Sequence, residues 1–358
     1  ANLLCFLRSR VKFCHPVINK LKSLRSSYSI VRSRHEIALN CVRESTFRCT
    51  RIGDTKRGLT ESRRGISFYR WLDLRCTNRE AFFILFIIFQ LFPLLWSFVL
   101  SFHEWNGLGP MRFRGLGNYR YLLRDQMFLD SLKNTLLYWC ADILVVIPLA
   151  LLLASLLNNH WLKGRNGIQT IMFLPYVSAT VAVGWVFYMI FDDNTGLINN
   201  MLVYLRLSPQ PWLTSTRLSK IPVMILGIWR VTPWYMLILY SGLKSIDPQL
   251  YDASKIDGAK PHQNLFYITI PSIAPILSFC FITLSIESFR KFAEPYILTG
   301  GGPGTSSMSL VQYLYNNGFI IFKLGYASAI GWALTVILLI ISLGQLKIMM
   351  KRAKDWSG

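Results

Sequence analysis

Residues 135–157, TLLYWCADILVVIPLALLLASLL, form a run in which Asp142 is the single charged side chain. At a helical rise of 1.5 Å per residue, about 20 apolar residues cross the hydrocarbon layer of a bilayer. The run therefore predicts a membrane-spanning helix, and it decides the fold class.

Other windows of similar length repeat this pattern, and we expect an all-α membrane protein with six transmembrane helices. Internal prolines are tolerated in such helices where neighbours re-satisfy the backbone, so we expect kinks at them. The expected spans, within a transmembrane domain of residues 81–349, are 81–102, 135–157, 168–191, 221–243, 268–289 and 324–346. The prolines are Pro93, Pro148, Pro175, Pro233, Pro271 and Pro275.

The composition of the whole chain agrees with this class. Its 358 residues are 52% hydrophobic and 16% charged, whereas soluble domains carry about 25% charged residues. A net charge of +21 on a soluble chain would suggest a nucleic-acid partner. Residues 1–80, however, hold 18 Lys and Arg against six acidic residues, ahead of the first span. We therefore expect membrane lipid, and no nucleic acid, as a partner.

The basic segment over residues 1–80 shows no sustained helical or strand period, so we expect a disordered cytoplasmic tail. It could also lie against anionic lipid as a polybasic segment, or be an extension that the working protein lacks. It contains no short apolar core of a cleavable signal peptide, so we expect the first span to be retained. Residues 350–358 form a second expected cytoplasmic tail.

The distribution of Lys and Arg indicates the orientation of the spans. Six spans place both termini on one side of the membrane. Counted from residue 60, that side carries 14 Lys and Arg and the opposite loops carry 11. The small excess favours cytoplasmic termini.

The loop of residues 245–267, between the fourth and fifth spans, has a clear local pattern. Asp247 followed by Pro248 is typical of a helix start, because the carboxylate accepts from free backbone N–H groups and proline suits the first turn. Gly258 suits a left-handed stop, and Pro261 can begin a second short helix. We expect a helix-turn-helix whose exposed face offers the small residues Ala253, Ser254 and Ala259.

The same loop carries a longer motif. Its residues, at the spacing EAA---G---------I-LP, are Asp252, Ala253, Ser254, Gly258, Ile268, Ile270 and Pro271. This motif resembles the coupling loop of binding-protein-dependent ABC importer permeases. The chain departs from it at Asp252 for Glu, Ser254 for Ala and Ile270 for Leu, and the first change shortens the acidic side chain by one methylene.

Further segments resemble the carbohydrate-importing branch of that family, typified by the maltose permease subunits. The resemblance covers roughly residues 80–350 and leaves out the tail. The segments that carry it are residues 115–119, 132–135, 173–175, 299–304 and 325–329.

The resemblance implies a subunit of the bacterial cytoplasmic (inner) membrane that passes a sugar or oligosaccharide into the cytoplasm. The implied partners are a second permease subunit, an extracytoplasmic solute-binding protein, and an ABC ATPase dimer that holds ATP and Mg. The implied coupling residues, on a cytoplasmic loop, are Asp252, Ala253, Ser254, Asp257, Gly258 and Ala259. Candidates for contact with the binding protein are Gly301, Gly302 and Pro303.

Three ionisable residues, Asp142, Arg230 and Glu287, lie inside the expected spans. Such residues are costly there and face a partner or an aqueous path. Asp142 and Arg230 lie about 10 Å and about 14 Å from the outer ends of their spans. We expect these two to pair, or to line the translocation cavity together. Glu287 could instead meet Lys291 one turn further on.

Aromatic side chains are candidates for the substrate path, because sugars present flat apolar faces ringed by hydroxyl groups. The same residues could equally form interfacial belts. The candidates are Trp185, Tyr188, Trp229, Trp234, Tyr235 and Tyr240. The positive charge excess would also suit an acidic, uronate-type oligosaccharide.

Catalysis is not expected on this chain. All five His residues lie outside the spans, and no GxxxxGK[ST] loop occurs, so ATP hydrolysis is expected on a separate subunit. The seven Cys residues show no metal-ligand spacing, so we expect no metal site. A secondary transporter or channel is a second class, but we find neither inverted repeats nor a selectivity sequence. An ABC permease for another solute, such as glycerol phosphate, stays open.

Overall fold

The computed structural model describes residues 82–158 and 164–357. The basic tail expected over residues 1–80 lies outside the described residues. The described residues belong to one compact unit, Ala81–Gly358.

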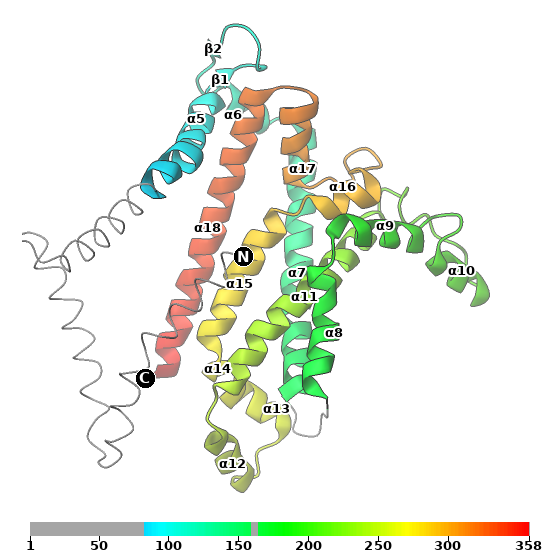
Figure 1. The fold of residues 1–358 in the computed structure, drawn as a ribbon, viewed down its shortest axis with the longest axis vertical. Helices are drawn as coiled ribbons and strands as arrows, with labels where there is room; N and C mark the ends of the chain where they lie inside the picture. The colour runs from blue at the N-terminus through cyan, green and yellow to red at the C-terminus, as the bar shows by residue number, and fades with distance from the viewer. Residues whose placement is uncertain (1–81, 159–163, 358) are drawn as a thin grey trace, which may run out of the picture. The chain divides into compact units, whose positions relative to one another are not determined.

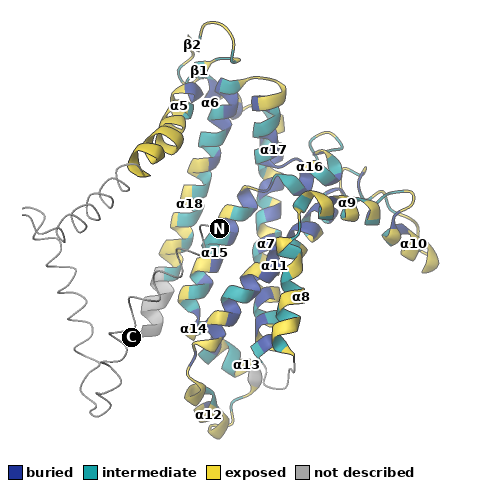
Figure 2. Ribbon diagram, in the orientation of Figure 1, coloured by how far each residue is buried: buried dark blue, intermediate teal, exposed yellow. Residues whose placement is uncertain are grey.

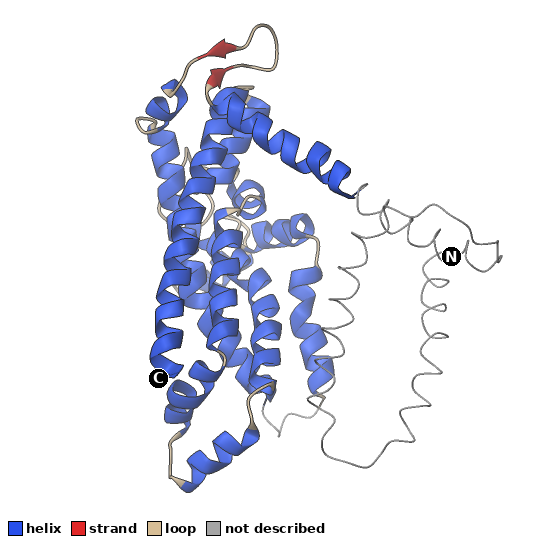
Figure 3. Ribbon diagram, turned by 90° about the vertical axis from the view of Figure 1, so that its left-hand side faces the viewer, coloured by secondary structure: helices blue, strands red, loops and turns tan. Residues whose placement is uncertain are grey.

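The described part of this unit is helical, apart from one small hairpin and connecting loops (Figures 1 and 3). The elements in chain order are η1 (Ile87–Leu91), α5 (Phe92–Ser101), β1 (His103–Glu104), β2 (Arg112–Phe113), α6 (Gly117–Leu122), α7 (Gln126–Asn158), α8 (Arg165–Val177), α9 (Thr180–Ile190), α10 (Leu197–Tyr204), α11 (Lys220–Lys244), α12 (Pro248–Ile256), α13 (Pro261–Asn264), η2 (Leu265–Thr269), α14 (Ile270–Ser272), α15 (Ala274–Phe289), α16 (Ala293–Thr299), α17 (Leu310–Tyr315), η3 (Asn316–Ile320) and α18 (Leu324–Ser357). The η elements are π-helical turns. α18 continues through most of the residues expected as a C-terminal tail.

Four helices are long and apolar enough to cross a bilayer: Phe82–Ser101, α7, α11 and residues Leu324–Met349 of α18. Two more spans arise if each of two bent helix pairs counts as one. α8 and α9 meet at 90°, and His262–Ser272 meets α15 at 76°. The described residues therefore hold four to six candidate spans, where the sequence predicts six.

The two bends arise beside prolines, whose missing N–H groups remove helix hydrogen bonds. α8 contains Pro175 and is followed by Ser178, whose backbone is extended at φ −65° and ψ 146°. In the second pair, Pro271 and Pro275 flank the break at Ile273. α7 and α11 continue through their internal prolines, of which Pro233 is buried and Pro148 is exposed.

The core lies where α7, α11 and α15 meet, and Figure 2 shows the buried residues gathered along these helices. Ala150 and Ala154 of α7 are fully buried there. A Cβ atom on Gly242 of α11 would lie 2.7 Å from Cδ1 of Ile276. Small residues at these contacts let the backbones approach, which supplies the packing that holds helices together in lipid.

The first candidate span lies at the edge of the unit. α5 packs against α18, while most residues of Phe82–Ser101 are exposed (Figure 2). In a bilayer such a face contacts acyl chains or another apolar helix.

The β1–β2 hairpin and α12 lie at opposite ends of the helices (Figures 1 and 3). The strands are antiparallel, with His103 opposite Phe113 and Glu104 opposite Arg112. This separation places the two loops on opposite sides of any membrane that the helices cross.

A carboxylate ties three helices together at the hairpin end. Asp125, between α6 and α7, accepts hydrogen bonds from the hydroxyls of Tyr313 and Tyr326. Burial, and the hydrogen bond to the Asp125 carboxylate, raise the pKa of Tyr313 to about 12. The Tyr313 hydroxyl therefore stays protonated at neutral pH and donates to Asp125.

We expect Gly325→Ala to destabilise the start of α18. An added Cβ would strike the carbonyl oxygen of His103, which is backbone and moves only at a cost. The expected loss is about 1–3 kcal/mol, visible as a lower midpoint of thermal unfolding in detergent. Gly344→Ala is the matched control in the same helix, because nothing lies within 4 Å of its added Cβ. Equal midpoints for the two variants would contradict the close packing of α18 against β1.

Candidate functional site

A cluster of charged side chains lies inside the bundle, next to the break between α8 and α9. Arg230 of α11 forms an ion pair with Glu294 of α16, with Nη2 and Oε1 3.3 Å apart. Its Nη1 also donates to the hydroxyl of Thr180, at the first turn of α9, over 3.2 Å. The Glu294 side chain is 5% exposed, so this pair is largely withdrawn from solvent.

A second carboxylate joins this group from the last turn of α15. The hydroxyl of Tyr235 donates to Oε2 of Glu287 over 3.2 Å. Glu287 is also close enough to interact electrostatically with Arg230 and Glu294. We refer to Arg230, Tyr235, Glu287 and Glu294 as the charged cluster.

Aromatic rings lie beside the charged cluster. The rings of Tyr176 and Trp234 stack with centroids 5.0 Å apart and planes at 16°, and Phe173 packs against both. Tyr176 lies within electrostatic range of Arg230 and Glu287. Trp234 is 39% exposed. An aromatic face therefore borders hydrogen-bonding groups where the helix is broken.

A separate buried ion pair crosses the bundle. Nζ of Lys291 lies 2.9 Å from one Asp142 carboxylate oxygen and 3.1 Å from the other. Ser288 donates to the same carboxylate over 2.6 Å, and the Lys291 ammonium lies 5.7 Å from the Tyr138 ring centroid. Gly227 leaves room for Nζ, because a Cβ there would lie 2.6 Å from it. Both charged side chains are 5% exposed.

The predicted pairing of Asp142 with Arg230 is wrong, because each binds a residue that follows α15 in the chain. The predicted meeting of Glu287 with Lys291 is also wrong. α15 ends at Phe289, so these residues do not share a helix face, and Lys291 turns toward Asp142.

Sequence reasoning missed Glu294, Tyr176 and Thr180, and it gave Lys291 the wrong partner. Lys291 and Glu294 follow the expected fifth span, and they enter the interior because α16 folds back onto α9 and α11. One signal was available: Asp142, Arg230 and Glu287 sum to one negative charge, which calls for another cation in the bundle.

The remaining aromatic candidates make contacts outside the charged cluster. Trp185 and Tyr188 of α9 form an edge-to-face pair 5.4 Å apart. Trp229 packs on Phe187 at 5.4 Å. Tyr240 lies beneath the Lys244 ammonium at 4.7 Å, toward the end of α11.

The loop of residues 245–267 has the local structure that its sequence predicts. The Asp247 side chain accepts from the backbone N–H of Gln249 over 2.9 Å, and α12 begins at Pro248. Gly258 has φ +72°, and α13 begins at Pro261. The helix start, the left-handed stop and the second helix are therefore confirmed.

One prediction for this loop needs correction. Ser254 does not lie on the exposed face: it is buried, and its hydroxyl donates to the Tyr251 carbonyl over 2.8 Å. Ala253 is exposed and Ala259 is half-buried. The exposed face carries instead Asp252 and Lys255, which form an ion pair at 2.9 Å.

The glycine-rich turn after α16 is tied down by hydrogen bonds. The Gly301 N–H donates to the Pro295 carbonyl over 3.2 Å, and the Ser307 hydroxyl donates to the Gly302 carbonyl over 3.0 Å. Gly301 is buried, whereas Gly302 and Pro303 are half-buried. Only part of the expected contact surface for a binding protein is therefore exposed here.

Residues 146–349, which include the charged cluster and the loop of residues 245–267, match the family described as binding-protein-dependent transport system inner membrane components. The chain belongs to this family. Across residues 82–158 and 164–357, no group of three His, Cys, Asp or Glu residues is arranged to hold a metal ion.

Relatives of this inner membrane component match over most of their length. The arabinooligosaccharides transport system permease protein AraP of Bacillus subtilis is 33% identical over 287 residues, which are 78% of this chain and 91% of AraP. The lactose transport system permease protein LacF of Rhizobium radiobacter is 33% identical over 260 residues, 71% of this chain and 87% of LacF.

A solved structure shares the fold of this inner membrane component. It is the bacterial alginate ABC transporter in complex with alginate pentasaccharide-bound periplasmic protein. One of its chains aligns with a TM-score of 0.69 and 24% identity, over 82% of this chain and 99% of that one.

We expect Asp142→Asn to destabilise this inner membrane component by about 3–5 kcal/mol, because it leaves the Lys291 ammonium buried without its counter-ion. The double variant Asp142→Asn/Lys291→Met should recover most of that loss. Asp130→Asn is the control, because its 3.7 Å pair with Lys133 is more exposed and is worth about 1 kcal/mol or less. Thermal unfolding in detergent compares the variants. If the double variant lost the sum of the stabilities that the two single substitutions remove, the coupling between Asp142 and Lys291 would be contradicted.

Proposed function

We propose that this chain is the membrane-spanning permease subunit of an ABC importer that passes a neutral sugar or oligosaccharide into the cytoplasm. Its family, and its near full-length likeness to permeases named for arabino-oligosaccharides and lactose, support the assignment. The observation that carries the sugar class within the chain is the Tyr176–Trp234 stack beside the charged cluster.

A sugar fits the chemistry of this site. Stacked aromatic rings bind the apolar face of a pyranose, and the arginine, tyrosine and carboxylates offer hydrogen bonds to its hydroxyl groups. Broken helices are where transporters place irregular backbone and polar groups, because these groups line a cavity there. The 90° break between α8 and α9 brings Thr180 to Arg230.

The charges of the cluster favour a neutral substrate. Arg230 faces both Glu294 and Glu287, so the cluster has no excess positive charge to balance a uronate or a phosphate. A buried anion without a counter-charge is costly. Acidic oligosaccharides and glycerol phosphate therefore fit this site less well. The net charge of the whole chain, taken alone, would admit them.

The proposed arrangement has six spans, with each bent pair crossing the membrane once and both termini in the cytoplasm. α12 is then a cytoplasmic coupling helix between the fourth and fifth spans, and the hairpin faces the extracytoplasmic side. The partners are a second permease subunit, a solute-binding protein, and an ATPase dimer that binds ATP and Mg and carries out hydrolysis.

The contacts of α12 suit it to transmit movement. The Tyr251 hydroxyl lies 2.9 Å from that of Thr269, which links α12 to the start of the fifth span. The Tyr251 side chain also packs against the buried core, to which Ile246, two residues before α12, belongs. A short helix anchored in this way passes on a displacement, whereas a mobile loop would absorb it.

We expect Gly258→Val to reduce sugar-stimulated ATPase activity of the assembled importer by about tenfold, because a β-branched residue resists the left-handed conformation at a cost of about 1–2 kcal/mol. Membrane insertion should be unchanged, since nothing lies within 4 Å of the added Cβ. The assay uses proteoliposomes with binding protein and sugar.

Gly258→Asn is the matched control for this measurement, because asparagine tolerates the left-handed conformation. It should keep most of the stimulation. Normal stimulation in the valine variant would count against α12 as the coupling helix.

We expect Trp234→Ala to raise the KM for sugar uptake by about two- to tenfold, the effect of losing one aromatic contact. Trp185→Ala removes an exposed tryptophan of α9 whose ring pairs with Tyr188, outside the charged cluster, and should leave the KM unchanged. Uptake of radiolabelled neutral and acidic oligosaccharides into cells measures both variants. Equal effects of the two substitutions would contradict the proposed path, and uptake of only the acidic sugar would contradict the substrate class.

A further inference from the structure

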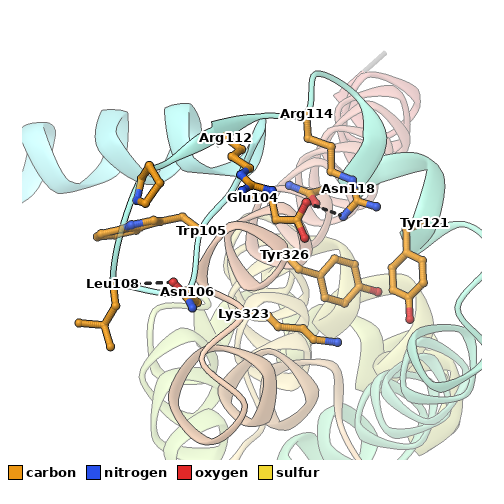
Figure 4. Close-up of a pocket in the computed structure, with 11 residues that line it drawn as sticks. Glu104, Trp105, Asn106, Leu108, Arg112, Arg114, Asn118, Tyr121, Lys323 and Tyr326 are labelled. Carbon is orange, nitrogen blue, oxygen red and sulfur yellow. Dashed lines mark hydrogen bonds and ion pairs between the residues drawn. The ribbon is translucent and has the colours of Figure 1, made fainter.

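A cavity of about 490 Å³ opens at the hairpin end of the bundle (Figure 4), and no residue of the charged cluster lines it. The β1–β2 hairpin, α6 and the residues around the start of α18 line it. Its volume lies in the range of small-molecule sites. The sugar path proposed above does not use it.

The walls of this cavity are held in place by local hydrogen bonds. The indole N–H of Trp105 donates to the Gly109 carbonyl over 3.2 Å and closes the hairpin loop. The buried amide of Asn118 donates to the carbonyls of Ser101 and His103 over 2.8 and 2.9 Å, which fixes α6 against the hairpin. The cavity is therefore formed before any ligand arrives.

Positive charge dominates its lining. Arg114 is partly balanced by Glu104, with 3.5 Å between Nη1 and Oε2 (Figure 4). Arg112 and Lys323 have no ion-pair partner within residues 82–158 and 164–357. Three cations thus face one carboxylate, so the cavity suits an anion.

The remaining lining residues are aromatic or amide side chains, together with Leu108 and Pro110. The rings of Tyr121 and Tyr326 meet edge to face at 5.1 Å, and the Tyr326 hydroxyl is already used by Asp125. Trp105 lies across the cavity from this pair (Figure 4). Tryptophan and tyrosine gather at the level of lipid headgroups.

The position of the cavity along the helices sets its depth in the membrane. The first candidate span ends at Ser101, and the last begins at Leu324. Lys323 therefore directly precedes the last span, and the hairpin that carries Arg112 and Arg114 follows the first, which places these cations at headgroup level. Apolar side chains beside them are exposed: Leu108, Phe113, Phe319, Ile320, Ile321 and Phe322.

Basic residues on this side of the membrane oppose the usual distribution. The segment of residues 103–134 contributes five of the 11 Lys and Arg that weaken the orientation signal. Two of these five, Arg112 and Arg114, line the cavity, where an anion would compensate their charge.

We propose that this cavity binds the phosphate headgroup of an anionic phospholipid, such as phosphatidylglycerol, in the leaflet at the hairpin end. Arg112 and Lys323 hold the phosphate, and the acyl chains lie along the exposed apolar faces of α5 and α18. The proposal rests on the membrane location of the chain and not on the identity of its transported sugar.

The test uses the assembled importer, purified and delipidated in detergent, and titrated with dioleoylphosphatidylglycerol while native mass spectrometry counts bound lipid. Arg112→Gln/Lys323→Gln should weaken the tightest lipid site about fivefold per cation removed, or about 25-fold in total. Arg120→Gln/Arg124→Gln also removes two positive charges, from residues beside the cavity that do not line it, and should bind as the wild type does. Arg112→Lys/Lys323→Arg keeps the charge and should retain binding. This variant distinguishes the effect of lost charge from that of a folding defect.

Three results would overturn the proposal. The first is equal binding of phosphatidylglycerol by the glutamine variant and the wild type. The second is equal affinity for dioleoylphosphatidylcholine, or displacement of the lipid by millimolar glycerol phosphate, which would indicate a non-selective or soluble-anion site. The third is loss of solute-binding-protein binding in the glutamine variant with unchanged lipid binding, which would assign the cavity to that protein.

Discussion

The Asp142–Lys291 ion pair joins α7 to the segment that follows α15, deep among apolar helices. Neither charge could stay there alone, because an unpaired ion in a water-poor interior costs several kcal/mol. The chain must therefore turn back directly after Phe289, which brings α16 onto α9 and α11. That turn supplies Glu294 to Arg230, so the geometry of the charged cluster depends on the same constraint.

The elements that hold the charged cluster also connect it to α12. Tyr251 bonds to Thr269, and the chain then passes through the break at Ile273 into α15, which carries Glu287 in its last turn. A displacement of α12 therefore reaches the cluster through one short series of packed elements. The break at Ile273 lets the parts of this series on either side of it change their angle, which a continuous helix would not allow.

The sequence predicted features that local chemistry determines. Apolar runs marked the helices, Asp247 marked the start of α12, and Gly258 marked its left-handed stop. It could not predict tertiary placement: Ser254 is buried, one turn along α12 from Tyr251, which packs against the core. Lys291 was assigned the wrong partner because helical spacing fails once α15 ends. Pro175 predicted a kink in this span, but not its 90° angle.

The central claim is that a separate ATPase moves this permease through α12. Ile256, which is 87% exposed on that helix, is the position to test it. With cysteine there, a short bifunctional thiol reagent is applied to inverted vesicles that contain the assembled importer. The account predicts a crosslink to the nucleotide-binding subunit whose yield changes when ATP is added. A crosslink to no such subunit, or labelling by an impermeant reagent from the extracytoplasmic side, would contradict it.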